Sequence, residues 1–392
     1  MTDFYGDSGN NTVLASAGYN HLYGGRGNDH LESSVPGFAY WEGGEGDDYL
    51  SAAFGGTTYG NYYGGDGNDA IFFYTTVSNV QYVYGGEGDD YATNSTGGTG
   101  STNSMVYGGG GRDAILAGDG SDTLYGDAGN ESGGNIIGIN GVTSTPGLYG
   151  GNGNDVVFGG DGYDVLFGGS GNDWLYGGAE GDTMYGGTGN DVLLTGTAGA
   201  YTLGTDVALG DAGDDYIYIG GAASSPVSAY GGIGNDTLVA LDNSTSILIG
   251  DDGNDWLYGN GANDYAYGGT GNDTMFGGDG VDVLIGGAGD DIFYGGTGVN
   301  YYFGGDGGGA GTSTGTNTYY VGGTTGIQVV QDFNVRDSVG FIGPVGSLIN
   351  SNELLLSHSY QNGAYFVIQL DSATAIWLNG TNATEFASTH SF

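Results

Sequence analysis

Aspartates recur at a fixed spacing in two uninterrupted stretches of the chain. Residues 250–294 read GDDGNDWLY, GNGANDYAY, GGTGNDTMF, GGDGVDVLI and GGAGDDIFY, which follow the nine-residue frame GGxGxDxUx with U apolar. Residues 150–194 repeat the same frame. Carboxylates and backbone carbonyls are hard oxygen ligands, and a flexible glycine turn can supply the about six to eight oxygens that calcium accepts. The spacing therefore predicts a row of calcium sites.

Each frame predicts a turn followed by a short strand. Paired glycines permit positive φ and close backbone approach, and the xUx segment forms a strand with one side chain pointing inward. Two frames make one coil of about 18 residues, and such coils stack. The predicted fold is all-β, a flattened right-handed parallel β-roll (β-solenoid). Its expected inward side chains in the second stretch are Leu257, Ala266, Met275, Leu284 and Phe293.

The sixth-position residues divide into two predicted sides, because the turns of a coil alternate between its two ends. Side A, in which every coil keeps an acidic turn, contains Asp29, Asp48, Asp69, Asp90, Asp113, Glu131, Asp155, Asp173, Asp191, Asp215, Asp236, Asp255, Asp273 and Asp291. Side B keeps the motif in Asp122, Asp164, Asp182, Asp264 and Asp282. All of these residues are candidate metal ligands. Glu131 is longer than Asp, Asn300 lacks charge and Glu180 replaces a turn glycine, so weaker sites are expected near them.

Longer segments rich in Ser, Thr, Asn and Gly occupy the rest of side B. They are almost free of acid, with Glu42, Asp206 and Asp242 as exceptions, so we interpret them as a decorated surface and not as calcium turns. The period fails past Gly323, where alternation in residues 364–370 and 374–378 predicts ordinary strands. The sequence thus predicts a roll over residues 1–323 and a C-terminal β cap over residues 324–392.

Aromatic residues precede most side A turns, among them Tyr63, Tyr84, Tyr107, Tyr125 and Tyr149. Strand alternation places them on the outer face, in a column spaced by roughly 4.8 Å. Such a column either stiffens a thin solenoid or forms a docking stripe for a neighbouring molecule.

The composition of the 392-residue chain demands a cation. It contains 91 Gly, 46 acidic residues and three basic ones, with a formal net charge of -43 and no cysteine. Self-repulsion of this size opposes a compact state. The lack of basic clusters argues against nucleic acid as a partner. The sequence contains no apolar run of about 18 residues, so it does not predict a membrane-spanning segment. Without cysteine, the chain can form neither a disulfide nor a thiolate metal site.

No catalytic constellation stands out, so the sequence predicts a protein that is not an enzyme. The four histidines are His21, His30, His358 and His390, and no HExxH pair occurs. There is no GxSxG elbow. The paired acids could suggest a glycosidase, but each belongs to a turn that already explains it.

The repeats at 24–32, 150–194 and 250–294 resemble the RTX (repeats-in-toxin) family of haemolysin-type calcium-binding repeats. The resemblance implies a parallel β-roll with a calcium ion between turns on the same side of successive coils, held by backbone carbonyls and the sixth-position carboxylates. Pairing adjacent turns gives on the order of 15 ions. The tail, with QDFN at 331–334 and TEFASTHSF at 384–392, resembles the family's C-terminal segment, which implies export by type I secretion machinery.

Two functions remain open at this point. The first is a secreted structural protein that folds on calcium outside the cell and polymerises with itself into a filament, sheet or surface layer. The second is a monomeric adhesin or matrix-binding module that holds a cell-surface glycan through the side B loops.

Overall fold

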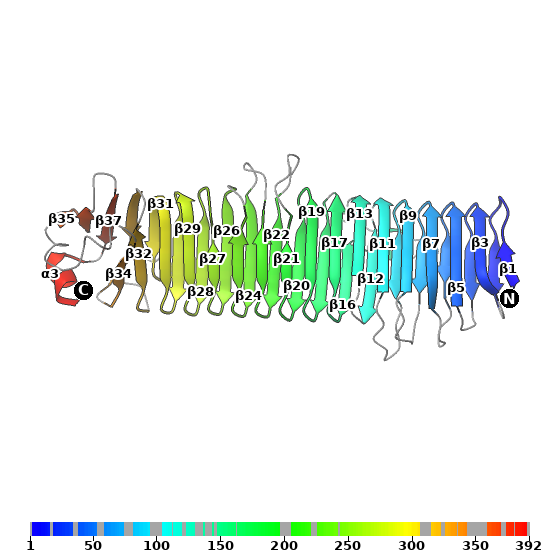
Figure 1. Cartoon of the computed structure of the whole chain (residues 1–392), viewed down its shortest axis with the longest axis horizontal. Helices are drawn as coiled ribbons and strands as arrows, with labels where there is room; N and C mark the ends of the chain where they lie inside the picture. The colour runs from blue at the N-terminus through cyan, green and yellow to red at the C-terminus, as the bar shows by residue number, and fades with distance from the viewer. Residues whose placement is uncertain are drawn as a thin grey trace. The chain divides into compact units, whose positions relative to one another are not determined.

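The computed structural model describes residues 2–15, 19–33, 38–52, 59–73, 81–94, 104–111, 113–119, 123–129, 136–137, 143–144, 147–161, 163–196, 205–220, 226–241, 244–305, 315–322, 326–334, 336–342, 359–369, 374–379 and 381–389. The chain forms two compact units, Met1–Ala208 (unit 1) and Leu209–Phe392 (unit 2). Successive strands in each unit pair in parallel with the strand one coil further on (Figure 1). The predicted parallel β-roll is confirmed.

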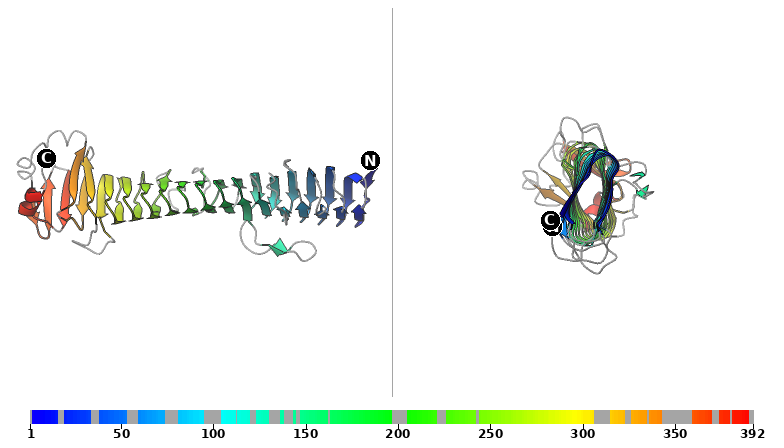
Figure 2. Two further views of the ribbon diagram at one scale, coloured as in Figure 1. Left: turned by 90° about the horizontal axis from the view of Figure 1, so that it is seen from below. Right: turned by 90° about the vertical axis from the view of Figure 1, so that its right-hand side faces the viewer.

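Unit 1 contains two parallel sheets that face each other, as the blue N-terminal coils show in end view (Figure 2). The β1 sheet contains β1 (Thr2–Tyr5), β3 (Tyr19–Arg26), β5 (Phe38–Glu45), β7 (Tyr59–Asp66), β9 (Gln81–Glu87), β11 (Ser104–Gly111), β13 (Thr123–Gly129), β17 (Val156–Asp161), β19 (Trp174–Ala179) and β21 (Val192–Leu194). The β2 sheet contains β2 (Thr12–Ala15), β4 (His30–Ser33), β6 (Tyr49–Ser51), β8 (Ala70–Phe73), β10 (Tyr91–Asn94), β12 (Ala114–Asp119), β16 (Gly147–Asn152), β18 (Val165–Ser170) and β20 (Thr183–Thr188). A separate antiparallel pair joins β14 (Ile136–Ile137) and β15 (Thr143–Ser144).

Unit 2 repeats this arrangement. The β23 sheet contains β23 (Tyr216–Ile219), β25 (Thr237–Ala240), β27 (Trp256–Tyr258), β29 (Thr274–Gly280), the first part of β31 (Ile292–Phe303), β32 (Thr318–Gly322) and β34 (Ser338–Ile342). The β24 sheet contains β24 (Val227–Ile233), β26 (Ser246–Asp252), β28 (Tyr265–Thr270), β30 (Val283–Ala288), the last part of β31, β33 (Gly326–Val330) and β37 (Thr374–Asn379). Strand β22 (Val207–Ala212) begins at the end of unit 1 and continues into unit 2.

The core of each unit lies between its sheets and consists of the apolar eighth-position side chains. In unit 2 the predicted inward residues Leu257, Ala266, Met275, Leu284 and Phe293 are all buried. Because side chains alternate along a strand, the residues on either side of each of these face outward. The sequence prediction of the inward positions is confirmed.

The outward aromatic residues do stack, but not in the single predicted column. In the β1 sheet, Tyr84 and Tyr107 lie with ring centroids 4.8 Å apart, and Tyr107 and Tyr125 lie 4.6 Å apart. Tyr125 then stacks on Phe158 at 5.0 Å. Tyr149 instead lies in the β2 sheet and stacks on Phe167 at 4.5 Å. The prediction that Tyr125 and Tyr149 share one column is therefore wrong.

The end of unit 2 departs from the parallel pattern. Strand β36 (Tyr365–Gln369) pairs antiparallel with β37 and with β35 (Ser359–Asn362). The short helix α3 (Ala383–Thr389) follows, and the side chain of Asn382 accepts hydrogen bonds from the amides of Thr384 and Glu385 at its start. The sequence prediction did not include this helix. The predicted boundary between roll and cap at residue 323 stays a prediction. No helix in the described residues has the length and apolar character to cross a membrane.

Candidate metal sites

The turns aim the sixth-position carboxylates into the stack of coils. In the turn from Gly24 to Asp29, Gly25 has φ 109° and Gly27 has φ 98°, values that favour glycine. The backbone thereby reverses within six residues, and Asp29 is buried at the start of the next strand. The same turn precedes the other described sixth-position aspartates, which are buried as well.

One carboxylate oxygen of each aspartate closes a ladder between coils. The backbone amide of Asp48 donates to Oδ1 of Asp69 at 2.8 Å, and the amide of Asp69 donates to Oδ1 of Asp90 at 2.7 Å. In unit 2 the amide of Asp255 donates to Oδ1 of Asp273 at 2.9 Å. Each aspartate thus fixes the amide of its counterpart one coil earlier, which holds the column in register.

The second carboxylate oxygen, Oδ2, is buried and accepts no hydrogen bond from the described residues. A buried polar atom without a partner costs free energy, so it indicates a missing interaction. This holds for Asp29, Asp48, Asp69, Asp90, Asp173, Asp182, Asp236, Asp255, Asp264, Asp273, Asp282 and Asp291.

Backbone carbonyls converge on the same points. A Cβ added to Gly24 would overlap both Oδ2 of Asp29 and the carbonyl oxygen of Gly43 in the next coil. A Cβ added to Gly250 would overlap Oδ2 of Asp255 and the carbonyl oxygen of Gly268 in the same way. The first-position glycine therefore leaves open a cradle in which a carboxylate oxygen and a carbonyl oxygen face each other.

Burial raises the pKa of these carboxyl groups. The pKa rises to about 7 for Asp48, about 8 for Asp69 and about 9 for Asp90, with loss of hydration as the largest cause and neighbouring carboxylates adding to it. In unit 2 burial raises the pKa of Asp255 to about 8. The ionised form of the column is thus disfavoured at neutral pH unless a cation compensates its charge.

The donor set fits calcium. The described residues contain no cluster of three or more His, Cys, Asp or Glu side chains suited to a metal. The cradles instead combine carboxylate oxygens with backbone carbonyls, and calcium accepts such hard ligands in variable geometry. Zinc, which prefers nitrogen and sulfur ligands, does not fit this set.

The structure corrects the assignment of these residues to two sides. Asp113 ends a turn that leaves the β1 sheet after β11, whereas Asp155 ends a turn that leaves the β2 sheet after β16. Tyr125 in β13 lies opposite Phe158 in β17, so Asp164, which follows β17, and Asp113, which follows β11, both end turns that leave the β1 sheet. Predicted side A therefore joins residues from two different edges of unit 1.

An inserted segment causes the error. Residues 130–146 lie between β13 and β16, so the 24 residues from Glu131 to Asp155 cover half a coil and not a whole one. Spacing along the sequence does not distinguish half a coil that carries an insertion from a whole coil. Within unit 1 the ladders are Asp29–Asp48–Asp69–Asp90–Asp113, Asp164–Asp182–Asp206 and Asp155–Asp173–Asp191.

Unit 2 carries two ladders of its own. They are Asp215–Asp236–Asp255–Asp273–Asp291–Asn317–Asp337 and Ser246–Asp264–Asp282–Asn300. Of the predicted ligands, Asp122 and Glu131 lie outside the described residues.

Four ladder members escaped the sequence prediction, namely Asp206, Ser246, Asn317 and Asp337. Asp206 was interpreted as part of a decorated loop, yet its Oδ1 accepts the amide of Asp182 at 2.9 Å, so that interpretation is wrong. Asn317 and Asp337 extend the Asp291 ladder beyond the repeats, where the sequence no longer keeps the GGxGxD frame. The signal that remains is a polar Asn or Asp two places before an inward apolar residue, as in Asn317 before Tyr319.

Acidic turns stacked on a parallel β-roll define a calcium-binding β-solenoid. The family model of the RTX calcium-binding nonapeptide repeat (four copies) matches residues 5–34, 98–131, 149–184, 164–193, 241–275 and 276–309. These stretches of the chain are therefore RTX calcium-binding repeats, and the resemblance of the repeats predicted from the sequence is confirmed. No curated protein matches the chain.

Proposed function

We propose that this chain is a secreted calcium-binding structural protein that folds outside the cell when calcium enters the acidic turns. The observation that carries the proposal is the column of buried Oδ2 atoms with no hydrogen-bond partner. We assign the predicted sixth-position carboxylates as the calcium ligands, together with the first-position carbonyls that face them. The expected number remains on the order of 15 ions.

The same columns support folding that depends on calcium. Burying ionised carboxylates at successive coils without counter-charge is unfavourable, so the roll is unstable at neutral pH when calcium is low. Calcium modules outside the cell typically bind at about 0.1–1 mM. The chain would then pass unfolded through type I secretion machinery and fold after export.

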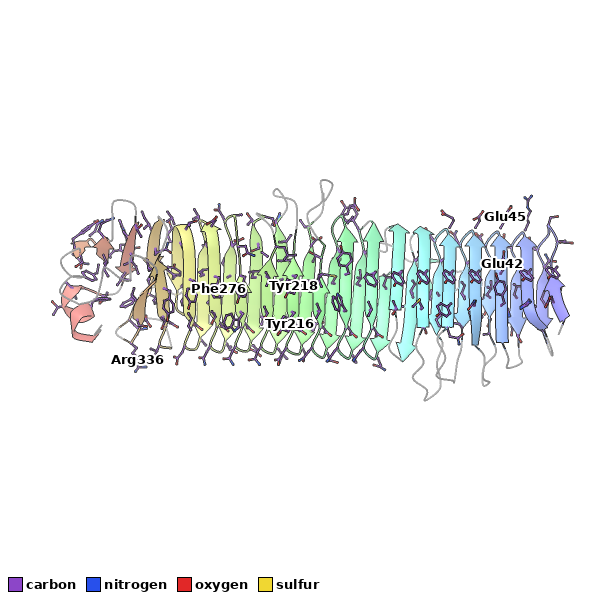
Figure 3. The ribbon with its side chains drawn as sticks, viewed as in Figure 1. Glu42, Glu45, Tyr216, Tyr218, Phe276 and Arg336 are labelled. Carbon is purple, nitrogen blue, oxygen red and sulfur yellow. The ribbon has the colours of Figure 1, made fainter. Side chains whose placement is uncertain are left out.

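Self-assembly is the finer part of the proposal, and exposed aromatic side chains support it. In unit 2, Tyr216 and Trp256 are about half exposed on the outer face of the β23 sheet, with exposed fractions of 51% and 48%. Phe276 lies on the same sheet, stacked 4.6 Å from Tyr258 (Figure 3). Exposed aromatic patches are typical of interaction surfaces. We propose that this face packs against a second copy of the chain.

The experiment titrates calcium into the full chain and follows far-UV circular dichroism together with electron microscopy. We expect β structure first and ordered polymers above a threshold protein concentration. The double variant Tyr216→Thr with Trp256→Thr should fold at the same calcium concentration and polymerise less, because Thr already occupies the adjacent positions Thr237 and Thr274. Polymers that form equally in both proteins would contradict the role of this face.

A chain that folds but stays monomeric at every concentration would favour the second candidate, a glycan-binding adhesin. About half of the residues in the long side B segments assigned to that role lie outside the described residues. No described residue favours it over self-assembly.

A further inference from the structure

A gap interrupts the aromatic column of the β1 sheet near its start. Glu42 lies opposite Tyr23 on one neighbouring strand and opposite Tyr63 on the other. Tyr23 stacks on Tyr5 at 4.8 Å, and Tyr63 stacks on Tyr84 at 4.8 Å, in each case on the far side from Glu42. In this column of outward side chains, the carboxylate of Glu42 thus lies between two aromatic residues.

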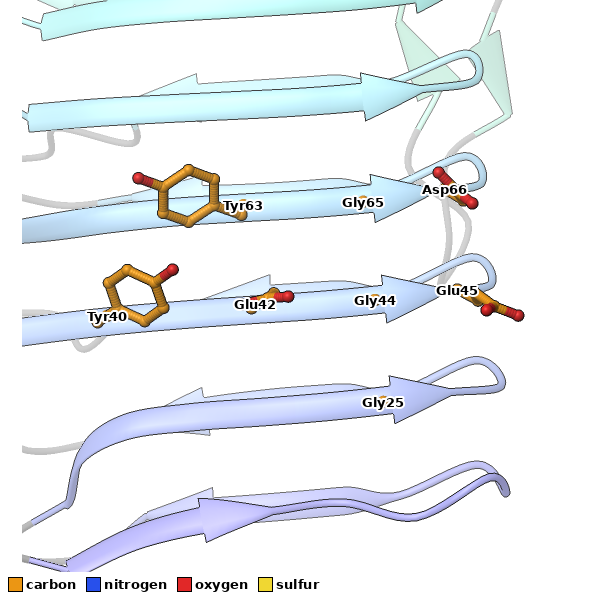
Figure 4. Close-up of a pocket in the computed structure, with 8 residues that line it drawn as sticks. All are labelled: Gly25, Tyr40, Glu42, Gly44, Glu45, Tyr63, Gly65 and Asp66. Carbon is orange, nitrogen blue, oxygen red and sulfur yellow. The ribbon is translucent and has the colours of Figure 1, made fainter.

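The ring of Tyr40, which lies two residues before Glu42 on the same face, is placed between the rings of Tyr23 and Tyr63. This ring lies 5.8 Å from Tyr23 and 5.3 Å from Tyr63, tilted by 45° and 41°, whereas the neighbouring rings are nearly parallel. A groove of about 540 Å³ opens beside it. The groove is lined by Gly25, Tyr40, Glu42, Gly44, Glu45, Tyr63, Gly65 and Asp66 (Figure 4).

The groove has an aromatic end, a glycine floor and an acidic end. The rings of Tyr40 and Tyr63, together with the carboxylate of Glu42, form the aromatic end. Glu45 and Asp66 form the acidic end, which lies at the turn (Figure 4). Arg26 forms an ion pair with Glu45 at 3.2 Å. Among the described residues, no ion pair involves Glu42 or Asp66. The groove therefore carries two carboxylates without a counter-ion, one near each end.

We propose that this groove binds an aliphatic diamine or polyamine. Residues 42 and 45 are three places apart on an extended strand, so the two negative ends lie about 10 Å apart. One ammonium group would pair with Glu42 and lie against the tyrosine rings, which attract cations. The other would pair with Asp66, and the methylene chain would cross Gly44 and Gly65, where no side chain obstructs it.

A single metal ion fits the groove less well. Glu42 and Asp66, the two carboxylates without a counter-ion, are too far apart to share one ion, and tyrosine ring faces offer no hard ligand. A neutral sugar would use the rings but would leave the carboxylates without counter-charge. The combination of ring faces and two separated charges favours an extended dication.

The test is isothermal titration calorimetry of 1,5-diaminopentane into the calcium-saturated full chain at low salt. We expect saturable binding of one molecule to this groove, and weaker binding of pentylamine, which carries one charge. Glu42→Gln should weaken diamine binding about tenfold, which corresponds to about 1.4 kcal/mol. Arg26→Gln should strengthen it, because it removes a repelling charge from the acidic end.

Glu385→Gln is the matched control, since it removes the same charge from the exposed helix α3 of unit 2. Equal weakening by Glu42→Gln and Glu385→Gln would overturn the proposal in favour of general attraction to an acidic protein. Equal affinity for diamine and monoamine would overturn it as well. If Glu42→Gln fails to fold on calcium, Tyr63→Leu replaces it, and undiminished diamine binding by that variant would count against the groove.

Discussion

The aspartates of the repeats and those of the C-terminal tail differ in how their two oxygens are used. In the repeat ladder of unit 2, Asp255 and Asp273 use Oδ1 for a backbone amide and leave Oδ2 without a partner. In the tail, Asp332 accepts the amides of Gly304 and Gly305, one on each oxygen. Asp337 likewise accepts the amides of Asn317 and Asn334.

This difference separates two roles for one residue type. Backbone amides reach both oxygens of Asp332 and Asp337, so these two carboxylates close the C-terminal coils without a metal. The repeat carboxylates are half satisfied, so they need a cation. The positions just past the repeats support this view, because the uncharged Asn300 and Asn317 accept the amides of Asp282 and Asp291 there. Calcium dependence should therefore be concentrated in the repeats and be weakest in the tail.

The largest expected effect comes from filling one cradle. In Gly250→Ala the new Cβ would overlap Oδ2 of Asp255 and the carbonyl oxygen of Gly268. We expect a loss of about 3 kcal/mol in the free energy of unfolding, because the stacked backbone cannot move aside. Denaturant unfolding in calcium measures this loss.

Gly363→Ala provides the control for that variant. Gly363 has φ 63° in the hairpin between β35 and β36, and a Cβ there would meet no atom within 4 Å. Backbone strain alone should cost about 1 kcal/mol. Equal losses for the two variants would show that the cradle has no special role.

The second prediction replaces one aspartate by asparagine in the repeats and one in the tail. Asp273→Asn keeps an oxygen for the amide of Asp255 and removes the carboxylate charge, so the calcium midpoint of folding should rise several-fold. Asp332→Asn leaves one glycine amide without an acceptor, which should cost about 1–3 kcal/mol. Its calcium dependence should change little. Circular dichroism against free calcium gives both midpoints, and a larger shift for Asp332→Asn would reverse the comparison.

The third and smallest effect concerns pH in the absence of metal. Burial raises the pKa of Asp69 to about 8 and that of Asp90 to about 9, from an ordinary value of 3.8. The folded state therefore holds these protons more tightly than the unfolded chain, and its stability falls as pH rises from about 4 to about 9. In chelator we expect more β structure at pH 4 than at pH 8. Saturating calcium should reverse that order, and the same content at both pH values without calcium would contradict the argument.

The sequence predicts the regular parts of this molecule well because each frame contains its own physical reasons. Paired glycines set the turn, the sixth-position Asp has a fixed role and residues such as Leu257 and Met275 must face inward. The fold class and the inward positions follow from these local rules. The family follows from the same frames.

What the sequence does not reveal is which strands become neighbours after an insertion. The segment between β13 and β16 shifts the alternation of turns, so Asp155 lies on another edge than Asp113. Asp206 and Asp337 were missed because the GGxGxD frame does not precede them in the sequence, although the stacked amides still need an acceptor. These features depend on pairing between coils, which local patterns do not encode.

Hydrogen exchange with mass spectrometry, with and without a calcium chelator at neutral pH, tests the central claim most directly. In calcium we expect protection of the ladder amides in both units. In chelator, peptides that contain Asp48, Asp69, Asp255 and Asp273 should lose protection, while those that contain Gly304, Gly305 and Asn334 should retain more of it. Full protection of the repeats in chelator would contradict the claim that the buried Oδ2 atoms require a cation.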